Sequence, residues 1–226
     1  MRYRYNGGVM DERMDVFLNM LYGDDEQYLQ ELAEYAEEIH APIMRKQTAV
    51  ILRFLIKKDD INNILEIGTA IGYSALYMAQ CDSDVRIDTI EKVPARIEDA
   101  KRHFAKYDTA KRIKLLEGDA LEMLKKLADS DKKYDLIFLD AAKAQYSEYL
   151  PYIRKIMSDK ATLVTDNVLQ EGEILESRYA VNRRDRTIHS RMREFLRELC
   201  DEDKWNTIVL PVGDGMAIST ISHTLL

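Results

Sequence analysis

The feature that most constrains this chain is a regular alternation of short apolar runs with amphipathic stretches of helical spacing. The helical stretches fill the intervals between the runs, and one of them has Pro94 in its first turn, where proline is tolerated. This alternation predicts a parallel β-sheet covered by helices. The apolar runs that we expect to be strands are residues 62–68, 85–90, 113–118, 134–140 and 161–167.

The two ends of the chain extend this pattern. Residues 206–221 predict an antiparallel hairpin around the Gly-Asp-Gly turn at 213–215, and residues 11–40 have helical spacing that is broken near Gly23. A further helix is expected over residues 48–56. We therefore predict an α/β fold, with a Rossmann-like seven-stranded sheet, a C-terminal antiparallel hairpin, helices on both faces and extra N-terminal helices.

The length and composition fit a single domain. A chain of 226 residues, of which 46% are hydrophobic, can bury one sizeable core. We expect one domain over residues 1–226, with a helical cap over about 1–60 and the Rossmann-like core over 61–226. The apolar stripe of the first helix could join the core, which is the common outcome, or cover a site or a subunit contact. Its residues are Met14, Phe17, Leu18 and Leu21.

Several classes of protein are disfavoured by composition. The net charge of −7 does not favour a general nucleic-acid-binding protein, although a local basic patch is compatible with it. No segment approaches the ~18 consecutive apolar residues of a membrane helix, and the N-terminal sequence does not resemble a signal peptide. We expect a cytoplasmic protein with no membrane partner. Cys81 and Cys200 lack metal-ligand spacing and do not indicate a disulfide framework.

A glycine-containing turn follows the first predicted strand. Gly68 and Gly72 lie where a strand passes into a helix, so the backbone can approach a ligand closely. The spacing Glu-x-Gly-x-x-x-Gly, which begins at Glu66, differs from the dinucleotide pattern GxGxxG. Glu91, at the end of the second strand, is placed to bind ribose hydroxyls. These features favour S-adenosylmethionine over a dinucleotide, and the alternative is a structural strand-to-helix turn.

The third predicted strand ends on Gly118-Asp119-Ala120. An Asp at this position can accept a hydrogen bond from the exocyclic amine of adenine. Asp119 could equally be the N-cap of a helix that begins at Ala120.

Oxygen ligands end the fourth and fifth predicted strands. Asp140 ends one, and Asp166 and Asn167 end the other, so neighbouring parallel strands would bring them together. Oxygen donors without His or Cys suit Mg²⁺. The alternative is that these side chains are independent strand-end caps that face solvent. Lys143 follows closely, and a lysine beside a cation can act as a general base.

Five ordered segments resemble the metal-dependent, S-adenosylmethionine-dependent O-methyltransferases, the family that includes catechol and caffeoyl-CoA O-methyltransferases. The resemblance extends from about Glu31 to Ser219 and implies a methyltransferase sheet. It also implies a homodimer. The segments are HAPIMRKQT (40–48), ILEIGTAIGYSA (64–75), DAAKAQY (140–146), TDNVL (165–169) and PVGDGMAIS (211–219).

The resemblance assigns roles to individual residues. It implies Mg²⁺ ligands at Asp140, Asp166 and Asn167 and catalytic roles for Lys143 and Asp140. Ala70 departs from the catechol enzymes, which carry an aromatic residue there, so their cofactor packing does not transfer directly. The implied cofactor contacts are Met44, Glu66, Gly68, Ser74, Glu91, Asp119, Ala120 and Asp140.

Clustered arginines after the fifth strand bear on the substrate. Arginine matches phosphate oxygens well, so a phosphate-bearing substrate such as tRNA would explain the cluster, and the alternative is a solvated, salt-bridged helix face. The chain resembles the branch of the family that methylates 5-hydroxyuridine at the wobble position of bacterial tRNA, which gives 5-methoxyuridine. The alternatives are a small-molecule O-methyltransferase for catechol-like vicinal hydroxyls and a non-catalytic cofactor-binding module. The cluster contains Arg178, Arg183, Arg184, Arg186, Arg191 and Arg193, and Arg45 and Lys46 could extend it.

Overall fold

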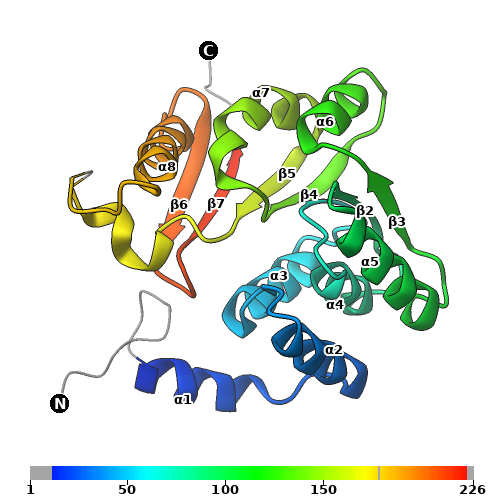
Figure 1. The fold of residues 1–226 in the computed structure, drawn as a ribbon. Coiled ribbons are helices and arrows are strands. Elements are labelled where there is room, and N and C mark those ends of the chain that lie inside the picture. The colour runs from blue at the N-terminus through cyan, green and yellow to red at the C-terminus, as the bar shows by residue number, and fades with distance from the viewer. Residues whose placement is uncertain (1–11, 178, 223–226) are drawn as a thin grey trace.

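A seven-stranded sheet forms the centre of the computed structural model, which describes residues 12–177 and 179–222. The strands are β1 Asn63–Ile67, β2 Arg86–Glu91, β3 Ile113–Glu117, β4 Tyr134–Leu139, β5 Met157–Thr165, β6 Trp205–Leu210 and β7 Met216–Ile221. They lie in the order β3-β2-β1-β4-β5-β7-β6 (Figure 1). The first five strands are parallel, and β7 pairs antiparallel with both β5 and β6. The predicted fold class is confirmed.

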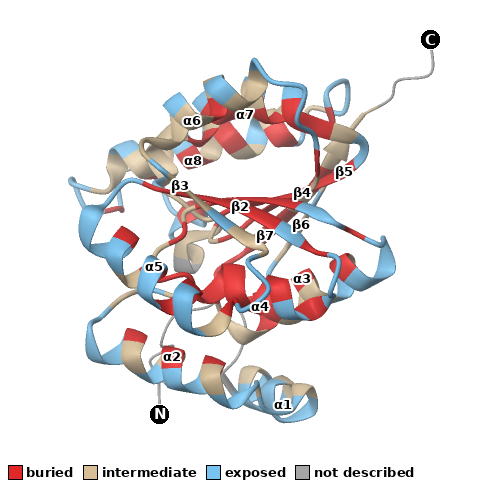
Figure 2. Ribbon diagram, turned by 90° about the vertical axis from the view of Figure 1, so that its right-hand side faces the viewer, coloured by how far each residue is buried: buried red, intermediate tan, exposed pale blue. Residues whose placement is uncertain are grey.

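Helices cover both faces of this sheet (Figure 2). One face carries α3 Lys46–Lys58, α4 Tyr73–Cys81 and α5 Pro94–Tyr107, and the other carries α6 Ala120–Ala128, α7 Tyr146–Ile156 and α8 Arg186–Leu199. Outside the first of these layers lie α1 Glu12–Tyr22 and α2 Gln27–Glu38. Two short 3₁₀ helices, η1 Lys143–Gln145 and η2 Gln170–Leu175, follow β4 and β5. None of the helices described is long and apolar enough to cross a bilayer.

Strand alternation explains the two hydrophobic layers. Successive side chains point to opposite faces, so Ile64 packs toward α3 and α4 whereas Leu65 packs toward α6 and α7. Both side chains are fully buried. Because both faces of the central strands are covered, β4 ends in the continuous buried apolar run of residues 136–139, as expected for a parallel sheet.

The fifth strand differs from its predicted range of 161–167. It begins at Met157, pairs with β4 through a register shift between Tyr134 and Leu136, and ends at Thr165. Residues 158–160 are polar and are not buried, so they carried no apolar signal. The strand ends early because Asn167 has a left-handed backbone (φ 59°), which turns the chain out of the ladder.

The apolar stripe of α1 does not pack in the core, so the common outcome expected for it from the sequence is wrong. Met14, Phe17 and Leu21 are each more than half exposed, and Leu18 is only partly buried. The helix is attached through polar contacts instead, since Gln47 of α3 donates hydrogen bonds to Asp15 (2.7 Å) and Asn19 (3.0 Å). The homodimer stays a prediction.

Candidate active site

A cavity of about 550 Å³ lies at the carboxyl ends of β1, β2, β4 and β5. This is the edge where open parallel sheets bind their ligands, and the volume falls within the range typical of small-molecule sites. The cavity brings together most of the residues predicted from the sequence. Those that line it are Met44, Arg45, Gly68, Ser74, Glu91, Ala120, Asp140, Lys143, Asp166 and Asn167.

Gly68 fixes how two strand ends meet. Its backbone has φ 111°, and a Cβ atom at this position would overlap the carbonyl oxygen of Asp140. The Asp140 N–H donates to the carbonyl of Ile67 (3.0 Å), so the chain after β4 crosses directly beside the turn after β1. The glycine therefore makes room for the protein's own backbone, in addition to opening the turn toward the cavity.

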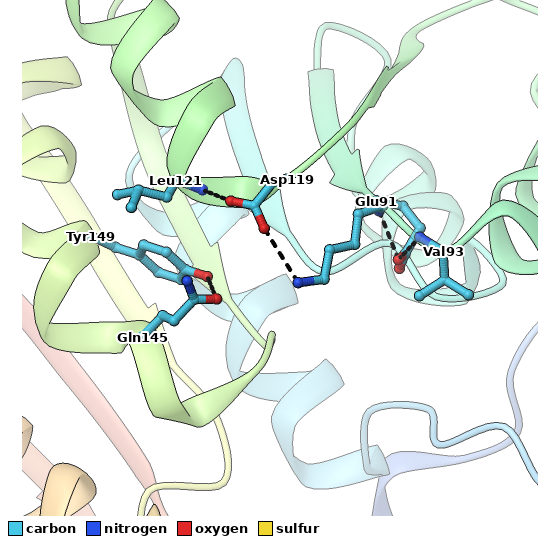
Figure 3. Close-up of polar contacts among 7 residues, drawn as sticks. Glu91, Val93, Asp119, Leu121, Gln145 and Tyr149 are labelled. Carbon is cyan, nitrogen blue, oxygen red and sulfur yellow. Dashed lines mark hydrogen bonds and ion pairs between the residues drawn. The ribbon is translucent and has the colours of Figure 1, made fainter.

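Glu91 ends β2 as a buried acceptor at the cavity wall. One carboxylate oxygen accepts from the N–H of Ala70 (3.0 Å). The other accepts from the N–H groups of Lys92 (2.8 Å) and Val93 (2.9 Å; Figure 3). The carboxylate is thereby held in one orientation, with lone pairs left for further donors. Ala70 itself has a left-handed backbone (φ 47°), a conformation that a side-chain pattern does not reveal.

Asp119 lies beside the cavity and caps a helix. Its side chain accepts from the N–H of Leu121 (3.0 Å), which makes it the N-cap of α6, and it forms an ion pair with Lys92 (3.2 Å; Figure 3). This ion pair connects the ends of β2 and β3. The Asp119 carboxylate therefore has the N-cap role that the sequence offered as an alternative. The neighbouring Ala120 and Gly118 line the cavity.

Glu66 is completely buried in β1 behind the cavity wall. Burial raises the pKa of this carboxyl to about 8, although the hydroxyl groups of Ser74 and Thr89 act to lower it. One oxygen, Oε2, accepts from the hydroxyl of Thr89. The other, Oε1, has no hydrogen-bond partner within the described part of the chain. A protonated Glu66 is therefore the favoured form at neutral pH.

The three predicted metal ligands converge after β4 and β5. Asn167 Nδ2 lies 3.3 Å from Asp140 Oδ1, and Asp166 accepts from the Asn167 N–H (2.8 Å) and from the Thr48 hydroxyl (3.2 Å). Burial, followed by the charge of Asp140, raises the pKa of Asp166 to about 7. Burial also raises the pKa of Asp140, while Asn167, Lys143 and then Arg96 act to lower it.

This donor set fits a hard divalent cation. Two carboxylates and an amide can offer oxygen ligands, and burial, which raises the pKa of both carboxyls, makes two negative charges here unfavourable without a compensating cation. The structure contains no group of three or more His, Cys, Asp or Glu residues arranged to hold a metal, among the residues it describes. The predicted ligands are not such a group, because the third of them is the amide of Asn167 and only two are carboxylates.

Lys143 begins η1 and lines the cavity beside Asp140. The preceding turn is held by Tyr146, whose hydroxyl accepts from the N–H of Ala141 (3.0 Å) and donates to its carbonyl (3.0 Å). Arg191 of α8 donates to the carbonyl of Ala144 (2.6 Å). The loop that carries the candidate base is thus fixed from two sides.

The arginines predicted as an RNA-binding patch differ in their contacts, and the patch stays a prediction. Arg186 donates to the carbonyls of Val181 and Tyr179, and Arg193 donates to the carbonyl of Glu176, as Arg191 does to Ala144. The remaining members differ in their surroundings. Arg183 and Arg184 are exposed, Arg45 lines the cavity, Lys46 forms an ion pair with Asp25 (2.5 Å), and Arg178 lies outside the described residues.

The sequence prediction missed other residues of the cavity lining, among them Tyr149, Arg96 and Asp214. Tyr149 lines the cavity from α7, and its hydroxyl donates to Gln145 (3.2 Å; Figure 3). Arg96 reaches it from the first turn of α5, where no pattern distinguishes a ligand-facing arginine from a solvated one. Asp214 is nearly buried in the turn between β6 and β7 and lines the cavity. The Gly-Asp-Gly sequence of this turn was the usable signal for it.

The fold and the cavity at its strand ends define an α/β methyltransferase, with a parallel sheet that closes in the antiparallel β5-β7-β6 arrangement. Residues 20–221 match the family model described as O-methyltransferase. The chain belongs to the O-methyltransferase family.

Individual relatives agree with this assignment. The chain is 31% identical to a catechol O-methyltransferase of Mycobacterium tuberculosis over 72% of this chain and 74% of that protein. A Staphylococcus aureus structure, named provisionally as a caffeoyl-CoA O-methyltransferase, is 31% identical with a TM-score of 0.86, covering 93% of this chain and 100% of that one. The O-methyltransferase TomG of Streptomyces achromogenes, solved with S-adenosylmethionine, is 25% identical with a TM-score of 0.78, covering 94% and 100%. The match to O-methyltransferase imqG of Aspergillus flavus spans about half of that protein (51%).

Proposed function

We propose that this protein transfers a methyl group from S-adenosylmethionine to a hydroxyl of a small aromatic substrate with catechol-like vicinal hydroxyls. The observation that carries the proposal is the position of Asp140, whose backbone packs on the glycine turn while its carboxylate meets Asn167. One residue thus joins the expected cofactor side of the cavity to the expected substrate side. The similarity to a catechol O-methyltransferase supports the choice of a small substrate over RNA.

Residues on the cofactor side have matching chemistry. Bound S-adenosylmethionine supplies an electrophilic methyl group on a sulfonium. Glu91 is a fixed acceptor for ribose hydroxyls, because its carboxylate is already oriented by three backbone N–H groups. Ser74 and Met44 line the same wall, and both are nearly buried, which restricts water near the cofactor.

On the substrate side the chain supplies a metal site and a base. Asp140, Asp166 and Asn167 would hold Mg²⁺, which lowers the pKa of a bound acidic hydroxyl. Lys143 Nζ accepts the proton of the attacking hydroxyl. The new O–CH₃ bond forms as the S–CH₃ bond breaks, and the electron pair of that bond stays on sulfur. Holding both reactants in line contributes up to about 7–11 kcal/mol.

The proposal is tested by measuring the turnover of catechol methylation in the wild type and in the variants Lys143→Ala and Lys160→Ala. Lys160 is exposed on β5 and outside the cavity, so its variant is the matched control. We expect Lys143→Ala to lower turnover about 10²- to 10⁴-fold, the usual contribution of a general base, with little change in S-adenosylhomocysteine affinity. The absence of methylated catechols from the wild type, or full turnover in Lys143→Ala, would contradict the proposal.

A second candidate substrate is 5-hydroxyuridine at the wobble position of tRNA. Two exposed arginines, Arg183 and Arg184, and the cavity residue Arg45 favour it. The test is mass spectrometry of nucleosides from 5-hydroxyuridine-containing tRNA incubated with the protein. Formation of 5-methoxyuridine supports RNA as the substrate, provided that the double variant Arg183→Gln/Arg184→Gln lowers methylation of the tRNA and leaves methylation of catechol unchanged. Unchanged nucleosides exclude this substrate.

A further inference from the structure

A second cavity, of about 180 Å³, lies at the opposite end of the parallel strands from the candidate active site. We call it the basal cavity. The beginnings of β1, β2, β3 and β4 form it, with β3 at the edge of the sheet (Figure 1). Neither the cofactor turn nor the predicted metal ligands contribute to it. Its charged lining residues are Arg86, Asp88, Lys111, Arg112, Lys114 and Lys132.

The basal cavity is strongly basic within an acidic protein. Five of its lining residues are cationic and Asp88 alone is anionic, whereas the whole chain has a net charge of −7. Strand alternation produces part of this clustering. Arg112 and Lys114 of the β3 segment are two residues apart, as are Arg86 and Asp88 of β2, and Asp88 is the register partner of Lys114.

Asp88 does not neutralise the cluster. It is nearly buried, accepts from the Tyr134 hydroxyl (2.6 Å) and forms an ion pair with Lys132 (2.5 Å). Its one negative charge is therefore matched by Lys132 alone. The other cations around the cavity have no carboxylate from its lining to balance them.

Donors for a ligand are left over at this site. Arg112 uses one terminal nitrogen for the carbonyl of Asp82 (2.6 Å), but its buried Nε has no acceptor within the described part of the chain. Lys111 and Lys114 are exposed, and neither ammonium forms an ion pair or a hydrogen bond with any described residue. Leaving a buried donor unpaired is costly, so a bound acceptor would stabilise the protein here.

We propose that the basal cavity binds a small oxyanion of the phosphate class, either inorganic phosphate or pyrophosphate, or the terminal phosphate of a larger metabolite. Arginine and lysine donors in one concave site match the several oxygens of such an anion. The volume is below that of typical sites for drug-sized ligands, which restricts the bound part to a phosphate group.

A nucleic-acid backbone fits this site less well. An extended polyanion needs a basic stripe, but the turn that meets Arg86 and Arg112 carries the exposed acids Asp82 and Asp84. These carboxylates would repel the further phosphates of a polyanion that passes this turn. A single compact anion avoids them.

Isothermal titration calorimetry of the full chain with inorganic phosphate and with pyrophosphate, at low ionic strength, tests the proposal. We expect saturable binding that weakens about three- to fivefold in Lys111→Gln and in Lys114→Gln, and more than about tenfold in the double variant, as for exposed charge pairs. Two matched variants serve as controls. Lys160→Gln removes the same charge elsewhere, and Arg45→Gln removes a cation from the active-site cavity.

The outcomes separate the alternatives. Binding that is lost in the Lys111 and Lys114 variants and retained in both controls supports the basal cavity as the site. Equal weakening in Lys160→Gln indicates nonspecific attraction, and loss in Arg45→Gln places the anion in the active site; either result overturns the proposal. So does absence of saturable binding, or binding of an anticodon stem-loop RNA through Lys111 and Lys114 without binding of phosphate. Thermal unfolding of each variant checks that it is folded. The proposal does not depend on methyl transfer.

Discussion

Replacing the buried Glu66 by Gln should change how the stability of this protein depends on pH. Glutamine has nearly the same shape but cannot ionise, so Glu66→Gln keeps the packing and removes the titration. In the wild type, burial raises the pKa of Glu66 from 4.5 to about 8. The unfolded chain loses this proton near the ordinary pKa, whereas the folded protein keeps it until the pH reaches about 8.

The sign of the effect follows from proton binding. Between the two pKa values the folded state binds more protons than the unfolded state, so the free energy of unfolding falls as pH rises. Each pH unit in this window costs the wild type up to about 1.4 kcal/mol. From pH 5 to pH 8 the wild type should therefore lose up to about 4 kcal/mol relative to Glu66→Gln, which lacks this contribution.

Urea unfolding of both proteins at several values between pH 5 and pH 8 measures this difference. Other groups titrate in the same range, including Asp166 with a pKa raised to about 7, but they are common to both proteins and cancel in the comparison. The expected result is a pair of curves that diverge steadily, with the variant gaining relative stability toward pH 8. Parallel curves would refute the reasoning, because they would mean that Glu66 is already ionised in the folded protein.

Three further predictions concern the strand ends. Gly68→Ala should lower the free energy of unfolding, measured in urea, by more than about 2 kcal/mol, because its Cβ atom would overlap backbone in addition to the strain at φ 111°. The control Gly23→Ala, at φ 72° with open space around it, should lower this free energy by only about 1 kcal/mol. Equal losses in the two variants would contradict the overlap. Tyr146→Phe leaves the N–H and carbonyl of Ala141 unpaired, so it should cost about 1–3 kcal/mol and lower methyl transfer, whereas unchanged turnover would separate this turn from catalysis. Chelation with EDTA should abolish turnover and leave S-adenosylhomocysteine binding, measured by calorimetry, nearly intact; undiminished turnover would remove the metal from the reaction.

The sheet was predictable because its signal is local. Apolar runs of strand length between helical stretches fix the type and order of the elements, and the Gly-Asp-Gly turn indicates the final hairpin. The start of β5 was not predictable, since its polar residues 158–160 join the ladder through a register shift that only the tertiary fold imposes. The exposure of α1 was missed for a related reason, because periodicity shows that a helix has an apolar face but not whether another element covers it.

The candidate site divides in the same way. Asp140, Asp166 and Asn167 were predictable because the ends of neighbouring parallel strands meet at one edge of the sheet. The left-handed backbone at Asn167 and the role of Gly68 toward Asp140 were not, because both depend on how separate strand ends cross. The contacts of the clustered arginines were not predictable either, since sequence proximity does not show which guanidinium groups bind backbone carbonyls.

Backbone hydrogen bonds explain why the chain is held more rigidly in register on one side of the cavity than on the other. On the proposed cofactor side, the N–H of Gly68 donates to the carbonyl of Ile90 (3.1 Å) and that of Asp140 to the carbonyl of Ile67 (3.0 Å), which continues the ladder of the sheet into the turns. On the substrate side, Arg45 and Lys143 come from segments outside the ladder, and Lys143 is positioned through side-chain contacts to its loop. Substitutions at Arg45 or around Lys143 should therefore leave the register of β1 and β4 unchanged. A change at Gly68 cannot be confined in this way, because it displaces the strand end that carries Asp140.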